Sequence, residues 1–164
     1  MNRRSLISLS AIAALGLALL PGIAVSQQKS LKAAIVGSWS ITAVVDQYES
    51  GKKINNWGTV KGNFSFDGAG RFSQIIVGDA QPAMKTPDPR KPDAPVVAYY
   101  GSYTVNEGAK TINGKVDAAS YSPRAGSEQT WTVEIKGDTL SLVGSPRKDQ
   151  EGTFTPRVEL KRAK

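Results

Sequence analysis

The sequence predicts an all-β domain, an eight-stranded antiparallel up-and-down β-barrel with a short helical turn before its first strand. Short runs that alternate apolar and polar residues recur along the chain, and Gly, Asn and Asp separate them. After the N-terminal segment, no run shows a sustained helical period of apolar residues. Eight strands that pair in sequential order can close on themselves and leave no unpaired edge.

The first elements are a helical turn at 31–35 and a strand at 37–47, in which Trp39, Ile41, Ala43 and Val45 occupy every second position. A ring as large as that of Trp39 at the start of a strand indicates a plug for one end of the barrel. Tight turns follow several of the later strands, as in Asp-Gly-Ala-Gly after the second. These later strands are expected at 60–66, 71–77, 96–105, 110–118, 128–136, 139–143 and 153–160.

The N-terminus has the pattern of an export signal. An arginine pair precedes an apolar run at 6–20, which is too short and too rich in Ala for a confident membrane span. A Pro-Gly pair then breaks the run, and small residues lead up to Ser26. We therefore expect 1–26 to be a signal peptide and 27–164 to be one domain, exported by the general route to the periplasm or beyond. The alternative is an uncleaved N-terminal anchor.

The composition excludes several classes of function. The chain of 164 residues contains no Cys and no His. The common zinc and blue-copper ligand sets are therefore unavailable, as are Ser-His-Asp and Cys-His catalysis. We expect no metal, no cofactor and no lipid attached to a cysteine. Without disulfides, the mature domain depends on an ordinary hydrophobic core, and it is expected to be a soluble monomer with no stable membrane anchor.

The charge is basic but dispersed. The formal net charge is +7, and it becomes +5 if Arg3 and Arg4 leave with the signal peptide. The basic residues occur as scattered pairs, whereas a nucleic-acid-binding protein more often gathers them on one element. The sequence therefore predicts a solvated surface and no nucleic-acid partner. The other interpretation of the basic charge is that it attracts acidic ligands.

Gly37-Ser38-Trp39, placed after a short helical turn, resembles the G-x-W signature of the lipocalins, which are barrels of the calycin type. In that fold the Trp packs across the closed end of the barrel, and an Arg after the last strand lies over it. Arg162 stands at the corresponding position. The resemblance therefore implies that Gly37, Trp39 and Arg162 build the base of the barrel.

More specifically, the chain is similar to the bacterial lipocalin-like domain proteins, a mostly uncharacterised group. GNFSFDGAGRFSQIIV at 62–77 resembles their G-x-φ-x-φ-x-x-D-G-x-φ hairpin, where φ is apolar, and AYYGSYTVNE at 98–107 resembles their Y-x-G-x-Y-x-V-x-E strand. A third segment, 115–131, falls on a family stretch with the elements H-V-E and G-x-x-Q-x-R. The resemblance covers nearly all of the predicted domain.

The third segment departs from the family pattern. Lys115 stands where the family usually has His, Asp117 where it has Glu, and Trp131 where it has Arg, while Gly126 and Gln129 are kept. Any chemistry that the family performs with that His is therefore not available to this chain in the same form.

Four candidate ligand-binding residues come from one face each of two expected strands. Tyr99 and Tyr103 share one face of the strand at 96–105, and Gln129 and Trp131 share one face of the strand at 128–136. Apolar and polar side chains that converge in a barrel mouth suit a small, mostly apolar ligand. The alternative is that these rings fill an eight-stranded interior, which is just wide enough for side chains.

Lys115 and Asp117 are two further candidates. Both lie on one face of the strand at 110–118, and Ile112 and Val116 lie on the other. If the polar face points into the barrel, the pair would anchor a ligand's acid group or move a proton. If it points outward, the two are ordinary surface charges.

Two features of the expected mouth remain. The connection at 78–95 contains five prolines, a density that excludes regular pairing, and it either gates the mouth or crosses it without a role. Trp57 lies in a loop and is expected at the rim, where it either covers the mouth or packs against its edge.

Three functions are compatible with the predicted barrel. The first is an exported barrel that binds a small apolar or amphipathic molecule, acidic ones included. The second is a barrel enzyme of isomerase or cyclase type, with Lys115, Asp117 or a tyrosine as the proton-handling group and no catalytic residue assigned. The third is a barrel filled by side chains, which serves as an interaction module of the cell envelope through its outer face.

Overall fold

The structure is a computed structural model that describes residues 29–79 and 94–164. The predicted signal peptide and most of the proline-rich connection lie outside the described residues. Within the described part, no helix is both long and apolar enough to cross a membrane. The elements are α1 (Leu31–Ile35), β1 (Gly37–Tyr48), β2 (Lys53–Ile54), β3 (Lys61–Phe66), β4 (Arg71–Val77), β5 (Val96–Asn106), β6 (Thr111–Ala119), the 3₁₀ turn η1 (Ser122–Arg124), β7 (Glu128–Lys136), β8 (Thr139–Gly144), β9 (Arg147–Asp149) and β10 (Gly152–Arg162).

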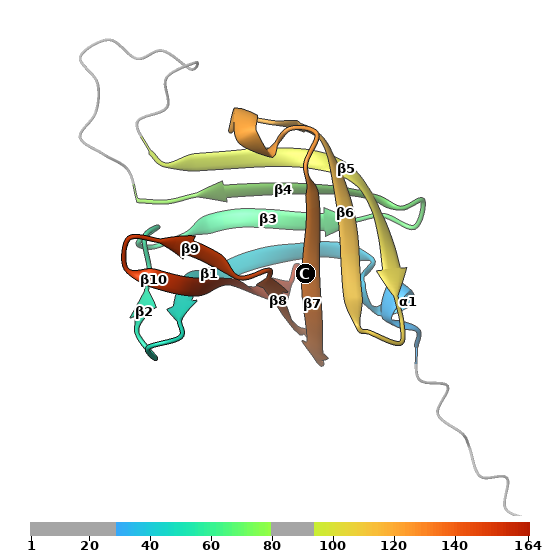
Figure 1. Ribbon diagram of the computed structural model, residues 1–164. Coiled ribbons are helices and arrows are strands. Elements are labelled where there is room, and N and C mark those ends of the chain that lie inside the picture. The colour runs from blue at the N-terminus through green and yellow to red at the C-terminus, as the bar shows by residue number, and fades with distance from the viewer. Residues whose placement is uncertain (1–28, 80–93) are drawn as a thin grey trace, which may run out of the picture.

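Eight of the strands form a closed antiparallel barrel. They follow the order β1-β3-β4-β5-β6-β7-β8-β10, and β10 pairs back onto β1. All eight match the predicted strands to within two residues at each end, so the predicted fold class is confirmed. The short strands β2 and β9, which were not predicted, extend β1 and β10 at one end of the barrel, and α1 lies at the other (Figure 1). We call these ends the mouth and the base.

Trp39 and Arg162 close the base. They are cross-strand partners on β1 and β10, and the indole is fully buried. The guanidinium carbon of Arg162 lies 4.1 Å from the centre of the Trp39 ring, a distance typical of a cation–π contact. The indole Nε1 donates to the carbonyl of Ile35 at 2.7 Å, and Arg162 Nη2 donates to the carbonyl of Ala34 at 2.7 Å. Both side chains thus hold α1 across the end of the barrel.

Gly37 is required where the chain passes from α1 into β1. Its φ of 128° lies in a region that L side chains rarely adopt, and a Cβ there would lie 3.0 Å from Arg162 Nη1. The three residues that the G-x-W resemblance assigned to the base are therefore in contact with one another.

A carboxylate fastens the other end of α1. Glu107, in the turn between β5 and β6, accepts hydrogen bonds from the backbone N–H groups of Leu31 at 2.7 Å and Lys32 at 3.0 Å. The hydroxyl of Ser30 accepts a third from Ala33 N at 3.2 Å. A negative charge and a hydroxyl cap are both favourable at a helix N-terminus.

Aromatic rings fill the base half of the lumen. Phe66 stacks on Phe64 with 4.4 Å between ring centres, and Phe64 meets the edge of Trp131 at 5.6 Å. Trp131 in turn contacts Phe72 at 5.7 Å, and Phe72 contacts Tyr99 at 5.9 Å. These rings form a continuous packed column from the base towards the mouth.

A β-bulge at Thr42 reverses the alternation along β1. Ile41 and Ala43 face consecutive residues of β10, which leaves Thr42 as the extra residue, and its hydroxyl donates to a β10 carbonyl at 3.0 Å. The predicted inward alternation is therefore right up to Ile41 and wrong from Ala43 onward. Val44 and Asp46 face the lumen in place of Ala43 and Val45, because the extra residue shifts the alternation by one position.

Replacing Trp39 by Ala should destabilise the fold by about 3–5 kcal/mol, because the change removes a fully buried ring and its contact with Arg162. Urea unfolding followed by far-UV circular dichroism measures this. Trp57→Ala, which removes a half-buried ring at the mouth, is the matched control and should cost clearly less. Equal losses for the two variants would contradict the assignment of Trp39 to the base.

Candidate functional site

A cavity of about 480 Å³ opens at the mouth. Its walls are the inner faces of β1, β4, β5, β7, β8 and β10, and η1 and the segment after β8 complete its rim. The volume lies within the range of about 300–1,000 Å³ that small-molecule sites occupy. The lumen is therefore filled by side chains in its base half and hollow in its mouth half.

The floor of the cavity is apolar and uncharged. Trp131 and Tyr99, the upper rings of the packed column, form it together with Leu142 and Ile76, and all four are buried. The hydroxyl of Tyr99 donates a short hydrogen bond to Oε1 of Gln74, which is also buried. Burial raises the pKa of Tyr99, which keeps the phenol protonated and able to donate at neutral pH.

Arg124 overhangs this floor from η1. Its guanidinium carbon lies 4.8 Å from the centre of the Tyr99 ring, and Nη1 donates to Oε1 of Gln129 at 3.3 Å. Gln129 is itself held by a hydrogen bond from its Nε2 to Oγ of Ser127 at 2.8 Å. The cation is therefore fixed at the side of the cavity by a ring and an amide.

Asp46 contributes a carboxylate to the opposite wall. It is half-buried, and its Oδ2 accepts a hydrogen bond from Nδ2 of Asn56 at 3.2 Å. Burial raises the pKa of Asp46; the bond from Asn56 and the charge of Arg147 lower it in part, and the charge of Asp149 raises it further. The cavity thus disfavours the ionised form of this side chain.

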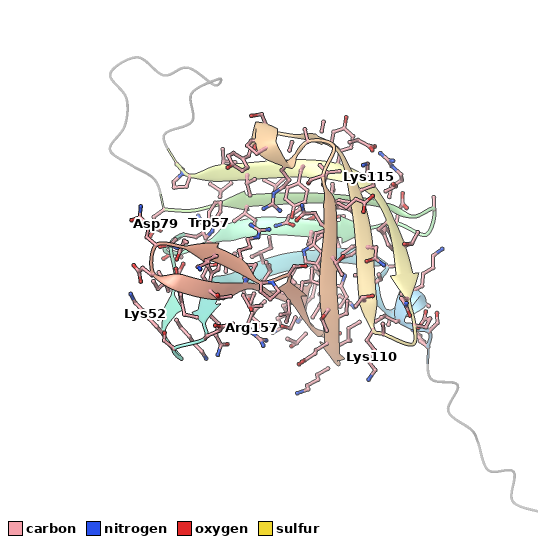
Figure 2. The ribbon with its side chains drawn as sticks, viewed as in Figure 1. Lys52, Trp57, Asp79, Lys110, Lys115 and Arg157 are labelled. Atoms are coloured by element: carbon pink, nitrogen blue, oxygen red, sulfur yellow. The ribbon has the colours of Figure 1, made fainter. Side chains whose placement is uncertain are left out.

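The rim is held together by hydrogen bonds of the backbone, one of them to a side chain. Trp57 lines the cavity, and its carbonyl accepts a hydrogen bond from Asp79 N at 3.0 Å, while Asp79 Oδ2 accepts one from Thr59 N at 3.1 Å. Figure 2 labels Trp57 and Asp79 close together at the mouth. Gly78 N donates to Pro95 O at 2.9 Å, so the two ends of the connection at 78–95 meet beside Trp57. The predicted position of Trp57 at the rim is confirmed, and the rest of the predicted gate lies outside the described residues.

The structure brings three of the six predicted ligand-binding residues together. Tyr99, Gln129 and Trp131 all line the cavity. Tyr103 is buried on the same face of β5 but lies nearer the base. Its hydroxyl donates to the carbonyl of Asp67 at 2.6 Å and its ring meets that of Phe66 at 5.1 Å, so its position is that of a core residue.

Lys115 and Asp117 lie on the outer face of β6, and the interpretation that this face points into the lumen is wrong. Lys115 Nζ donates to the carbonyl of Gly126 at 2.9 Å, and Asp117 accepts from Arg71 Nη2 at 2.6 Å with both partners about half exposed. On the inner face of β6, Gly114 lies between Ile112 and Val116. A Cβ at Gly114 would lie 2.7 Å from the Trp131 ring. The ring of Trp131 takes the space that a polar side chain would need.

Four charged residues of the cavity were not predicted, namely Asp46, Arg124, Glu128 and Arg147. The bulge at Thr42 turned Asp46 inward against the alternation of the strand. Arg124 lies in a polar turn and Arg147 in a three-residue strand, and neither element has a period that shows which way a side chain points. The only sequence signal was the placement of Arg124 between two strands that meet at the mouth.

Replacing Asp46 by Asn should raise the free energy of unfolding at pH 7, because the amide avoids the burial of an ionised carboxylate and can still accept the bond from Asn56. The gain should shrink as the pH falls through the raised pKa of Asp46 towards the ordinary value of 3.8, since the native carboxyl is then neutral. Thermal unfolding at several pH values measures this. A gain that is the same at pH 4 and pH 7 would contradict it, and Asp117→Asn on the outer face is the control.

No protein-family model and no curated protein matches this chain. Among solved structures it is similar to a lipocalin-like protein from Bacteroides uniformis ATCC 8492, with 18% identity, a TM-score of 0.44, and coverage of 79% of this chain and 98% of that one. It is also similar to an uncharacterised protein from Bacteroides eggerthii DSM 20697, with 19% identity, a TM-score of 0.40, and coverage of 77% and 98%. A third is mFAP1, a redesigned β-barrel bound to DFHBI, with 14% identity, a TM-score of 0.39, and coverage of 82% and 100%. The fold assignment, a closed eight-stranded antiparallel barrel, rests on the chain's own strand order.

Proposed function

We propose that this chain is an exported lipocalin-type barrel that binds a small amphipathic molecule in the cavity at its mouth. One observation carries the proposal: the packed column of rings ends at Trp131 and Tyr99, and a cavity of about 480 Å³ opens above it. A barrel that served only as a filled module would have no need to leave this half of its lumen empty.

The lining of the cavity supports an amphipathic ligand. Its deep part is apolar, with Trp131, Leu142 and Ile76, and its rim carries Arg124 and Asp46. Apolar walls with a few convergent polar groups are typical of small-molecule sites. The apolar part of the ligand would lie on the floor, with its polar end beside the rim.

Binding is favoured over an isomerase or cyclase activity. Lys115 and Asp117, the proton-handling candidates, lie outside the cavity. Two groups inside that could move a proton are engaged, Tyr99 with Gln74 and Asp46 with Asn56. We assign no catalytic residue.

Export and the monomeric state remain part of the proposal. They rest on the signal-like pattern of 1–26 and on the absence of cysteine from the whole chain. The full chain expressed in a Gram-negative host should yield a periplasmic protein whose intact mass corresponds to a start at Gln27. Recovery of the uncleaved chain in the membrane fraction would support the anchor instead.

Filling the cavity should abolish binding. The neutral fluorophore N-phenyl-1-naphthylamine should brighten and shift to the blue with the native protein. Ile76→Trp should remove the response, because Ile76 lines the cavity and is 4% exposed. Its control is Ile75→Trp, the neighbouring residue on β4, whose side chain is 49% exposed and should leave the response unchanged.

Circular dichroism checks that both variants fold. If Ile76→Trp does not, Val97→Phe, at a half-buried position of the same cavity, takes its place. A cavity variant that binds the probe as well as Ile75→Trp, or a native protein that binds neither the probe nor octanoate, would contradict the proposal.

A further inference from the structure

We infer that the mouth cavity selects carboxylic acids, and that Arg124 binds the carboxylate. This inference rests on the proposed function and names the class of ligand.

Arg124 has hydrogen-bond donors to spare. A guanidinium carries five N–H groups, and one of them donates to Gln129. Its guanidinium carbon lies 4.8 Å from the centre of the Tyr99 ring. Within residues 29–79 and 94–164, no carboxylate oxygen lies within 4.0 Å of it. A half-buried cation with no carboxylate within 4.0 Å in that part of the chain is stabilised by an anion that enters the cavity beside it.

The guanidinium is also held in place before a ligand arrives. Tyr99 supports it from below, and Gln129, itself fixed by Ser127, holds one edge. A cation that is already oriented loses little conformational entropy on binding. Its planar fork of N–H groups matches the two oxygens of a carboxylate, which it can bind with two parallel hydrogen bonds.

The other charges of the cavity favour a singly charged acid. Asp46 and Glu128 also line it, and Arg147 is the second cation. A phosphate monoester carries up to two negative charges at neutral pH and would meet more repulsion from these carboxylates than a carboxylate would. The apolar floor of Trp131 and Leu142 then accommodates the hydrocarbon part of the acid.

The test is a competition for N-phenyl-1-naphthylamine by octanoate, octan-1-ol and octyl phosphate at pH 7.5. Octanoate should displace the probe at a concentration roughly ten-fold or more below that of octan-1-ol, because a charge-assisted hydrogen bond contributes about that much. Arg124→Gln should bring octanoate to the level of octan-1-ol and still bind the probe. Arg157→Gln is the matched control: this residue, labelled in Figure 2, precedes the inward-facing Val158 on β10 and does not line the cavity.

The outcomes separate this inference from the proposed function. If the probe binds but octanoate competes no better than octan-1-ol, the cavity is a binding site and the inference is wrong. It is also wrong if Arg124→Gln keeps the preference, or if octyl phosphate competes better than octanoate. If the probe does not bind at all, calorimetric titration with octanoate decides: saturable heat that Arg124→Gln abolishes supports the inference, and no heat overturns it.

Discussion

The pairing of β1 with β10 is the interaction on which the rest of this structure depends. It turns a sheet with two edges into a closed barrel, and its first pair, Trp39 with Arg162, sets the register at the base. The same two side chains also bind α1 through hydrogen bonds. One pair of residues therefore joins the two edges of the sheet and covers the base of the barrel. With the base fixed in this way, aromatic side chains from β3, β4 and β7 pack upward from it, and the barrel divides into a solid half and a hollow half.

The bulge in that pairing is what gives the hollow half its charge. Thr42 adds one residue to β1, and every position of the strand beyond it changes face, so that Asp46 enters the cavity. Across from it, η1 supplies Arg124. The carboxylate is disfavoured by burial, and the guanidinium has no carboxylate beside it in the described part of the chain. Two of the charges at the mouth, those of Asp46 and Arg124, therefore come from departures from regular strand geometry, a bulge and a turn.

The fold could be predicted from the sequence because it depends on period-2 alternation and on turn residues, which are local. The base could be predicted only through the G-x-W resemblance, since nothing local connects Trp39 with Arg162 at the other end of the chain. Of the cavity residues, Tyr99, Gln129 and Trp131 could be predicted because they lie on regular stretches of β5 and β7. Asp46 was not, because a bulge depends on the pairing partner. For Lys115 the sequence left both orientations of its strand open, and the structure turns Ile112, Gly114 and Val116 inward instead.

The cap that Glu107 places on α1 has a topological consequence. It holds the point at which the chain enters the barrel, at Lys29 and Ser30, against the turn between β5 and β6. That turn lies beside α1 at the closed end of the barrel, away from the short strands β2 and β9 at the mouth (Figure 1). A segment or fusion partner attached ahead of Lys29 therefore joins the molecule at its closed end. Tethered to a surface by this end, the barrel would present its opening to the surrounding solution.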